Sequence, residues 1–489
     1  MPFIFEKAAK AIMTKMVSRP VAEATVKETT RKAADVLGKD VLTLAAKKDV
    51  AEIFEKDGLR GNLEKAMREW SRRHQKAPTA SEIEHFLAGG GGAKAEKVEG
   101  FVTPIVSYRP RNPALVPTKA EAEAIKKAMN ANSRATLAAL RTLPDGDRKA
   151  FRTVYDFMKD RPDGQRALQQ LLIDGRLSWG TATDQKRNLI QALADLAGDK
   201  KLDSGILHRR TTLMAQLTQE LADPVAVSQH YKGTCAATSR GQILWSMKNP
   251  TDYTDFVHDL ARPEGKAKLP SGEIVERPHD WDAGNDKSPN ALGLPGKPNK
   301  EGGRTISSQL TEPVFMQVGY GKQYRYSNTF DAAFSFQAPT NKMVMDGGLY
   351  GEQEARLLES IFPGKKYRVI YTSAKDLKES FGTVPKEVWQ GERVVMHKDH
   401  QLNVITTTAA VDNPIPVGVN YELGGGHAVL VTGTHDLHVP GGKHGPARDE
   451  TWVEYINPWG QREVMRDDAF KVVMDGLTTD GGVKGVVGG

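Results

Sequence analysis

The stretch Gln229-His230-Tyr231-Lys232-Gly233-Thr234-Cys235 ends in the only cysteine of this 489-residue chain. Small residues flank that cysteine on both sides, and Ala236-Ala237 follows it, a pattern that predicts a tight loop entering a helix. Backbone amides at a helix start lower the pKa of a thiol and favour thiolate. The amide of Cys235 and the side chain of Gln229 could also donate to an oxyanion. We therefore predict that Cys235 is a nucleophile.

Two motifs far downstream offer a base and a residue to orient it. His427 opens an apolar strand in Gly424-Gly425-Gly426-His427-Ala428-Val429-Leu430-Val431, where Gly426 leaves room for a substrate backbone. Asn457 follows the next strong strand in Ile456-Asn457-Pro458-Trp459-Gly460. Its amide oxygen could accept from the imidazole and fix the ring. We expect Trp459 to cover that hydrogen bond and to line the substrate site.

Together, Gln-x5-Cys, Gly-His-Ala-Val and Asn-Pro-Trp-Gly resemble the papain superfamily, and the Asn-Pro-Trp-Gly form is most similar to calpains. The resemblance implies a two-lobed fold over residues 225–475 and peptide hydrolysis through an acyl-enzyme. It also implies that Gly347 and Gly348, in Asp346-Gly347-Gly348, pair with the substrate backbone. Calcium dependence is not carried over with it.

Two features depart from that family. Cys235 is followed by Ala236, where papain-like enzymes commonly have a Cys-Trp pair, and the gap between Cys235 and His427 is long. The motifs are also similar to those of bacterial peptidases that trim double-glycine leader peptides, although Asn457 stands where that group has Asp. Ala236 and the long gap, the two departures from the papain superfamily, concern substrate specificity more than the catalytic mechanism.

Composition narrows the class of protein. Hydrophobic residues make up 39% and charged residues 26%, as in ordinary globular proteins, and the length predicts two to four structural units. One cysteine excludes an internal disulfide and two-cysteine metal sites. The net charge of +7 comes from 68 basic and 61 acidic residues that are interspersed, which is typical of a solvated surface and not of a nucleic-acid groove.

Other polar clusters do not match metal-site patterns. His435, Asp436, His438 and His444 share one Gly-rich stretch, but their spacing fits no strong metal signature. Acidic residues resemble a calcium loop only in composition, because they are out of register with its consensus; these are Asp280, Asp282 and Asp286. We predict no metal and no cofactor.

Composition along the chain divides it into five parts. Residues 1–88 have helical spacing, and Gly89 to Gly92 open a Gly- and Pro-containing linker over 89–117. A second helical region follows over 118–224, with a capping box at Thr118 and Glu121. Residues 225–475 are expected to form the catalytic domain and 476–489 a Gly-rich tail. The fold class is α+β: a helical lobe with the cysteine and an antiparallel β lobe with the histidine, after an all-α extension.

Apolar periodicity and turn residues locate the elements. Helices are predicted at Leu137–Leu143, Phe151–Met158, Leu168–Ile173, Leu189–Leu196, Leu213–Leu221, Cys235–Met247, Ser307–Lys322 and Glu352–Ile361. A hairpin is predicted around Pro270-Ser271-Gly272. Strands are predicted at Tyr367–Tyr371, Arg393–His397, Val404–Val411, Val417–Tyr421, His427–Thr432 and Trp452–Ile456.

The sequence contains no apolar stretch long enough to cross a membrane and no standard secretory signal. Residues 3–19 predict an amphipathic basic helix, for which packing on the next helix is favoured over contact with a membrane surface. A cytoplasmic location and export by a non-classical route, as for a bacterial effector or toxin, both fit.

The leading hypothesis is a cysteine endopeptidase that acts on polypeptides with a Cys-His-Asn triad. One alternative uses the same thiol for acyl transfer, deamidation or transglutamination. Another is a catalytically idle protein whose N-terminal helices bind a protein partner. A further hypothesis is that the helical half restrains or targets the enzyme, with autoprocessing at the Gly89–Gly92 stretch.

Overall fold

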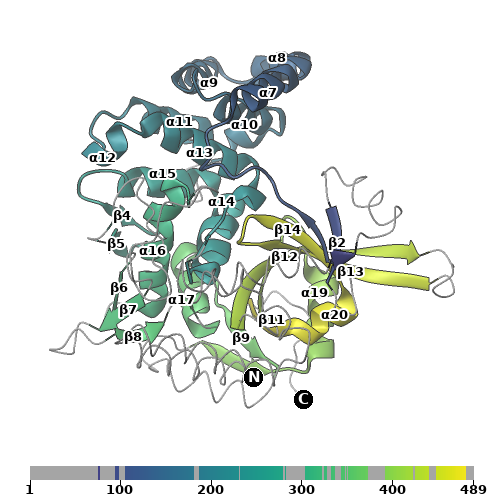
Figure 1. Cartoon of the computed structure of the whole chain (residues 1–489). Helices are drawn as coiled ribbons and strands as arrows, with labels where there is room; N and C mark the ends of the chain where they lie inside the picture. The colour runs from purple at the N-terminus through teal and green to yellow at the C-terminus, as the bar shows by residue number, and fades with distance from the viewer. Residues whose placement is uncertain are drawn as a thin grey trace, which may run out of the picture.

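The computed structural model places helices and strands in two parts of an α+β fold (Figure 1). It describes residues 75–76, 94–98, 105–180, 187–230, 232–278, 281, 303–321, 324–327, 332–335, 343–346, 348–349, 351–372, 391–421, 425–439 and 448–480. Several expectations concern residues outside these ranges; they are the helical character of most of 1–88, the helix over 3–19, Gly347, His444, and Asp280, Asp282 and Asp286.

Helices build most of the described chain between residues 119 and 226. They are α7 (Lys119–Ala131), α8 (Ser133–Thr142), α9 (Asp145–Phe157), α10 (Pro162–Ile173), η1 (Arg176–Ser178), α11 (Leu189–Gly198), α12 (Ser204–Leu207), α13 (Arg210–Ala222) and η2 (Pro224–Ala226). The five helices predicted between residues 137 and 221 are confirmed. The capping box that begins α7 is also confirmed, with Thr118 N donating to Glu121 Oε2 at 2.7 Å.

The helices that follow Cys235 come next in the chain. They are η3 (Ala237–Ile243), α14 (Leu244–Lys248), α15 (Pro250–Leu260), α16 (Ile306–Tyr320) and α17 (Gly351–Ile361). These helices share one hydrophobic core with α9 to α13, in which Leu217 and Phe315 are both fully buried. The side chain of Gln216 joins the two sets by accepting from the backbone amide of Ile306 at 2.8 Å. The predicted second helical region is therefore packed into the helices that follow it.

A large sheet forms the other part, with strand order β1-β2-β3-β14-β13-β12-β11-β15-β9-β10. Its strands are β1 (Gln75–Lys76), β2 (Lys94–Val98), β3 (Ile105–Tyr108), β9 (Arg368–Tyr371), β10 (Glu392–Val395), β11 (Ile415–Tyr421), β12 (Gly425–Val439), β13 (Arg448–Asn457), β14 (Gln461–Arg466) and β15 (Met474–Thr479). Neighbours pair antiparallel except β9 and β10, which are parallel.

Alternating side chains cover the two faces of this sheet with different cores. Val429 and Val431 of β12 pack with residues of α19 (Lys398–Thr408) and α20 (Asp467–Val473), including Ile405 and Phe470. Leu430, between those valines, packs with Ile243 of η3 on the opposite side. Because successive strand residues point to opposite faces, α19 and α20 cover one face of the sheet and the helices that follow Cys235 cover the other.

Two small sheets accompany the helices: a hairpin of β4 (Lys266–Lys268) and β5 (Ile274–Glu276), and a meander of β6 (Tyr324–Ser327), β7 (Ala332–Ser335) and β8 (Met343–Asp346). The hairpin predicted around Pro270-Ser271-Gly272 is confirmed, since β4 and β5 flank these residues. The predicted helices over 307–322 and 352–361 are confirmed by α16 and α17, and the strands predicted at 367–371, 417–421 and 452–456 by β9, β11 and β13.

The structure corrects several expectations. The predicted strand over 404–411 is mostly helix α19, since the Val and Thr pattern of a strand is outweighed by burial of Gln401, Val404 and Ile405 on one helical face. Strands β2 and β3 lie in the predicted linker over 89–117 and β1 in the predicted helical region over 1–88. Residues 476–479 of the predicted tail belong to β15, between β11 and β9 in the sheet.

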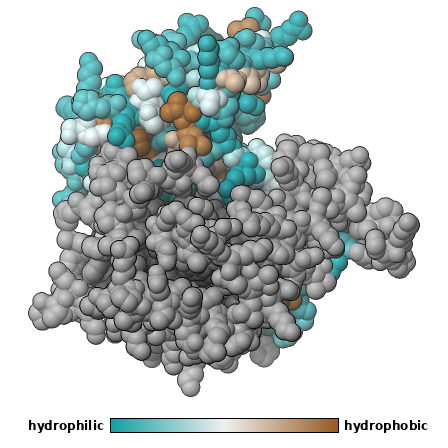
Figure 2. Space-filling model, viewed as in Figure 1, coloured by the Kyte–Doolittle hydropathy of each residue, from teal (hydrophilic) through white to brown (hydrophobic). Residues whose placement is uncertain are grey.

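The described surface of the helical part is mainly hydrophilic, with scattered apolar side chains (Figure 2). Among the large exposed apolar residues are Leu137, Trp179 and Leu207. In the part of the chain that the structure describes, no helix combines the length and the apolarity needed to cross a bilayer.

Candidate active site

Cys235 is half-buried at the first turn of a long helical segment. The turn closes where Thr238 N donates to Thr234 O at 2.8 Å, and the chain continues as the π-helix η3 and then α14. The helix predicted from Cys235 to Met247 is thus confirmed, and much of its first half is π-helical. The π-helix is rare in proteins, and where it occurs it is often at a functional site. Gly241 is required there, because a Cβ at this position would lie 2.3 Å from the Phe315 ring of α16.

A buried ion pair holds the residue before the cysteine. Thr234 Oγ1 donates to Glu312 Oε2 at 2.8 Å, and Arg304 Nη1 donates to the same oxygen at 3.0 Å. The side chains of Arg304 and Glu312 have no exposed surface. Burial raises the pKa of the Glu312 carboxyl, while Arg304 and Thr234 oppose the increase. The thiol-bearing turn is therefore anchored to a desolvated polar group, which resists displacement.

His427 and Asn457 are hydrogen-bonded partners. His427 lies on β12 opposite Val419 of β11, and its Nε2 is 2.9 Å from Asn457 Oδ1 at the end of β13. The Trp459 ring stacks on the imidazole, with centroids 4.4 Å apart and planes 29° from parallel. His427 is 8% and Asn457 1% exposed, so water has little access to their hydrogen bond. The predicted cover by Trp459 is confirmed.

The turn that carries Asn457 and Trp459 depends on Gly460, whose φ of 74° is in the left-handed region. A Cβ at Gly460 would lie 3.3 Å from the side chain of Ser228, which forms an isolated β-bridge with Trp459. This close approach joins the turn after β13 to the loop that leads to Cys235.

Gln229 lies in that same loop. Its backbone amide donates to Pro458 O at 2.8 Å, and its side-chain Nε2 donates to Lys232 O at 2.7 Å. An amide NH₂ has two hydrogens, so one remains to donate elsewhere. His230 has a φ of 53°, unusual for a residue with a side chain. The loop is sharply bent and attached to the turn that contains Asn457.

A fully buried guanidinium joins the cysteine helix to the histidine strand. Arg240 Nη1 donates to Val429 O at 2.7 Å, and Arg240 Nε to Glu354 Oε2 of α17 at 3.1 Å. Arg240 is five residues after Cys235, and Val429 two residues after His427. The structure therefore brings the elements that carry Gln229, Cys235, His427 and Asn457 together, at the junction of the helices and the large sheet.

The predicted substrate-binding glycines lie on two separate elements. Gly426 pairs with Asn420 of β11, next to His427. Gly348 follows β8 with a φ of 105°, and its carbonyl oxygen accepts from Tyr320 Oη of α16 at 2.8 Å. Gly348 is therefore attached to the helical part and Gly426 to the sheet.

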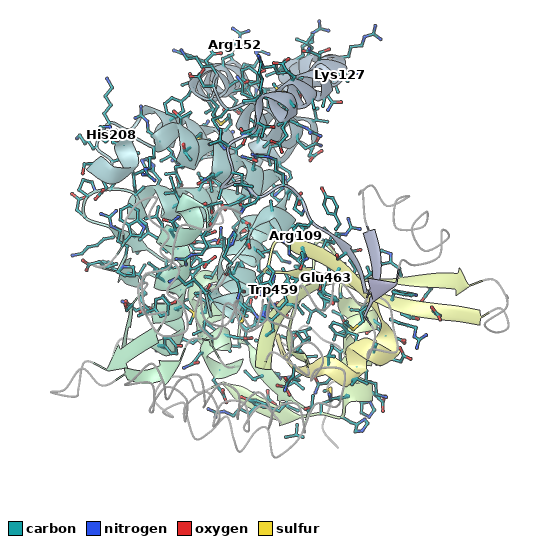
Figure 3. The ribbon with its side chains drawn as sticks, in the orientation of Figure 1. Arg109, Lys127, Arg152, His208, Trp459 and Glu463 are labelled. Carbon is teal, nitrogen blue, oxygen red and sulfur yellow. The ribbon has the colours of Figure 1, made fainter. Side chains whose placement is uncertain are left out.

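Sequence reasoning missed residues that support these side chains. Asn112 Nδ2 is 3.1 Å from His230 Nε2, and it lies on the segment that crosses from β3 to α7 in Figure 1. Asn457 Nδ2 donates to Glu463 Oε2 at 3.2 Å. Figure 3 shows Arg109, Trp459 and Glu463 near one another between the helices and the sheet. Strand alternation after Gly460 could have indicated Glu463, whereas nothing local identifies Asn112.

His435, from the Gly-rich stretch considered for a metal, lies on β12, and its Nε2 is 2.5 Å from Glu454 Oε2. Within the described ranges, no three potential ligands among His, Cys, Asp and Glu form a group that could hold a metal. Comparison of the chain with protein-family models, curated proteins and solved structures finds no match.

Proposed function

We propose that this protein is a cysteine peptidase with a papain-like two-lobed arrangement, in which Cys235, His427 and Asn457 act as the triad. The observation that carries the proposal is the 2.9 Å hydrogen bond between His427 and Asn457 beneath Trp459, on a turn attached to the loop that ends at Cys235. An imidazole oriented in this way is the base that a thiol needs.

The division of roles between the two parts of the fold supports the same proposal. The thiol begins a helix in the helical part, while the imidazole and its amide partner lie on neighbouring antiparallel strands. In the proposed function, an extended polypeptide substrate binds at this junction of the two parts. The papain-like part of the proposal rests on the resemblance of three sequence motifs, Gln-x5-Cys, Gly-His-Ala-Val and Asn-Pro-Trp-Gly, to those of that superfamily.

The reaction begins with transfer of the Cys235 proton to His427, which gives thiolate and imidazolium. The sulfur attacks the substrate carbonyl carbon, and the oxyanion is stabilised by the Cys235 amide and the Gln229 side chain. When the C–N bond breaks, the imidazolium gives its proton to the leaving amine, and a thioester remains. Water then loses a proton to His427 and attacks the thioester carbon. The C–S bond breaks, and the carboxylic acid leaves.

A labelled unstructured polypeptide such as casein tests this function with wild type, Cys235→Ala and Ser246→Ala. Ser246 is a matched control, since it lies on α14 and its hydroxyl donates to Ile243 O in its own helical segment. We expect cleavage by wild type and Ser246→Ala and a loss of at least about a thousandfold in Cys235→Ala. Equal cleavage by Cys235→Ala would overturn the proposal.

The products distinguish the alternative uses of the thiol. Mass analysis shows one added water per cleavage for hydrolysis, an added amine for acyl or glutamine transfer, and an amide converted to acid without chain cleavage for deamidation. Failure of a peptidyl epoxide to label Cys235, together with the absence of any such product, would instead support a catalytically idle protein that binds a partner.

A further inference from the structure

Both ends of the Asn457 amide are engaged. Oδ1 is 2.9 Å from His427 Nε2 and also accepts from the backbone amide of Trp459 at 3.2 Å. Nδ2 donates to Glu463 Oε2 at 3.2 Å. Rotating the amide by half a turn would place NH₂ against a backbone N–H and an oxygen against a carboxylate. The contacts therefore allow one amide orientation.

This orientation determines which histidine nitrogen carries a proton. An amide oxygen only accepts, so the His427 Nε2 beside it must donate. In the neutral ring the other nitrogen, Nδ1, then has the lone pair that can take a proton from a thiol. The tautomer needed for a base in the proposed reaction follows from the orientation of Asn457.

Glu463 is itself held by further contacts. It is 7% exposed on β14, opposite Ser107 of β3. With the Gln461 amide oriented to satisfy both of its ends, the Gln461 nitrogen donates to Glu463 Oε1 at 3.1 Å and its oxygen accepts from Arg109 Nη2 at 2.8 Å. Each carboxylate oxygen thus receives a side-chain amide, and the chain of contacts runs from β3 to the imidazole.

We propose that Glu463 is a positioning residue for the base: through Asn457 it sets the His427 tautomer and stabilises the imidazolium that forms when Cys235 loses its proton. This inference rests on the proposed function. A carboxylate next to the NH₂ of Asn457 aligns the amide dipole with its oxygen toward the imidazolium. Both the charge of Glu463 and the amide dipole then favour a protonated ring.

Other charged or titratable groups surround this chain of contacts. Arg109 reaches it from the end of β3 through Gln461. Arg240 binds Val429 O from the helix of Cys235, and His230 lies in the loop attached to Pro458. All of these groups remain when Glu463 alone is substituted. A change in the His427 pKa or tautomer in such a variant is therefore caused by the loss of the Glu463 carboxylate.

The test is NMR of ¹⁵N-labelled histidine in the full chain carrying Cys235→Ala, which removes the titration of the thiol. His427 is assigned by His427→Gln. With Glu463 present, we expect the neutral ring as the Nε2–H tautomer. Glu463→Gln, which keeps shape and removes charge, should lower the His427 pKa by about one unit. In Glu463→Asp the His427 pKa should stay close to the wild-type value. Both tautomers of the neutral His427 ring should be populated, however, because the shorter side chain withdraws from Asn457.

The matched control is Glu454→Gln, since Glu454 is a carboxylate of similar burial on neighbouring β13 that bonds to His435 and Thr432 instead of the triad. An unchanged His427 pKa in folded Glu463→Gln, or an equal change in Glu454→Gln, overturns the inference. Should Glu463→Gln not fold, an unchanged tautomer in Glu463→Asp overturns it equally.

Hydrolysis separates this inference from the proposed function. A shifted His427 pKa in a protein that cleaves no peptide would refute the peptidase and leave Glu463 as the positioning residue of an imidazole. Peptide cleavage by wild type, with the same tautomer and pKa in all Glu463 variants, would refute this inference alone. In an active enzyme, Glu463→Gln should also move the alkaline limb of the kcat/KM profile about one pH unit lower.

Discussion

The backbone amide of Gln229 donates to the carbonyl oxygen of Pro458 at 2.8 Å. This bond joins two segments that are more than 200 residues apart in the chain: the loop that ends in Cys235 and the turn that begins at Asn457. A backbone-to-backbone contact does not depend on side-chain identity, so it keeps both segments in register when either side chain is substituted. Single variants of the candidate residues should therefore remain folded.

The first prediction concerns the reactivity of the thiol. Iodoacetamide can alkylate only Cys235, and we expect fast modification near neutral pH. His427→Ala should slow it by about tenfold or more, because an imidazolium partner favours thiolate. Rates are measured by intact-protein mass spectrometry, with His208→Ala as a control on the outer helical surface labelled in Figure 3. Equal rates in wild type and His427→Ala would refute the pairing of Cys235 with His427.

The second prediction distinguishes the proposed role of Gln229 as oxyanion donor from the proposed role of Asn457 as orienting amide. Gln229→Ala should lower kcat by on the order of a hundredfold with little effect on alkylation of Cys235. Asn457→Ala should lower activity less than His427→Ala, since it misorients a base without removing it. Gln170→Ala, an exposed glutamine of α10, serves as the control. Loss of alkylation in Gln229→Ala would instead identify a structural role for Gln229.

A third prediction concerns the segment between β3 and α7. Asn112→Ala removes the contact with His230, next to the proposed oxyanion donor. We expect kcat to fall about tenfold because a looser loop positions Gln229 less well, whereas the rate of Cys235 alkylation should be unchanged. Asn130→Ala, on the exposed side of α7, is the matched control. Activity equal to wild type would show that the loop is held without Asn112.

Truncation is the fourth prediction, and it uses the pairing of β3 with β14. A chain that begins at residue 118 loses β3 and leaves β14, with Glu463, at the sheet edge; one that begins at residue 100 keeps β3. We expect the shorter chain to be inactive and to unfold at least about 5 °C lower, measured by calorimetry. Higher activity of the chain from residue 100 than of the full chain would indicate that the N-terminal residues restrain the enzyme.

The fifth prediction is a pH dependence of stability. Burial raises the pKa of Glu220 from 4.5 to about 7, against hydrogen bonds from Ser307 and Thr305. Between these values the folded state binds a proton that the unfolded state has lost. The contribution of Glu220 is therefore full below pH 4.5 and decreases by about 3 kcal/mol as the pH rises to about 7.

Glu220→Gln should remove this dependence, so the difference in the free energy of unfolding between wild type and variant should fall over that range in urea titrations. Glu123→Gln, an exposed carboxylate of α7 paired with Lys126, is the control and should leave the slope unchanged. A constant difference from pH 4.5 to 7 would show that Glu220 titrates alike in the folded and unfolded chain.

Local patterns in the sequence were sufficient for some elements and insufficient for others. Thr118 and Glu121 identified the start of α7, and apolar spacing identified α16 and α17, because caps and periodicity act within a few residues. The same reasoning gave a strand over 404–411, although residues 404–408 belong to α19. There the Thr side chains bond to their own helix, as Thr407 Oγ1 does to Asn403 O at 2.7 Å, and packing on the sheet decides the conformation.

By itself, the sequence determined which residue types could supply a thiol, a base, an orienting amide and an oxyanion donor, since those properties belong to single side chains and their immediate neighbours. Only the tertiary structure decided that residues 94–98 and 105–108 join the large sheet, that Asn112 meets His230, and that Glu463 stands behind Asn457. The first two depend on contacts between segments far apart in the chain, and the third on a turn that brings two neighbouring strands together. Strand pairing and burial are properties of the folded chain as a whole, and no short stretch encodes them.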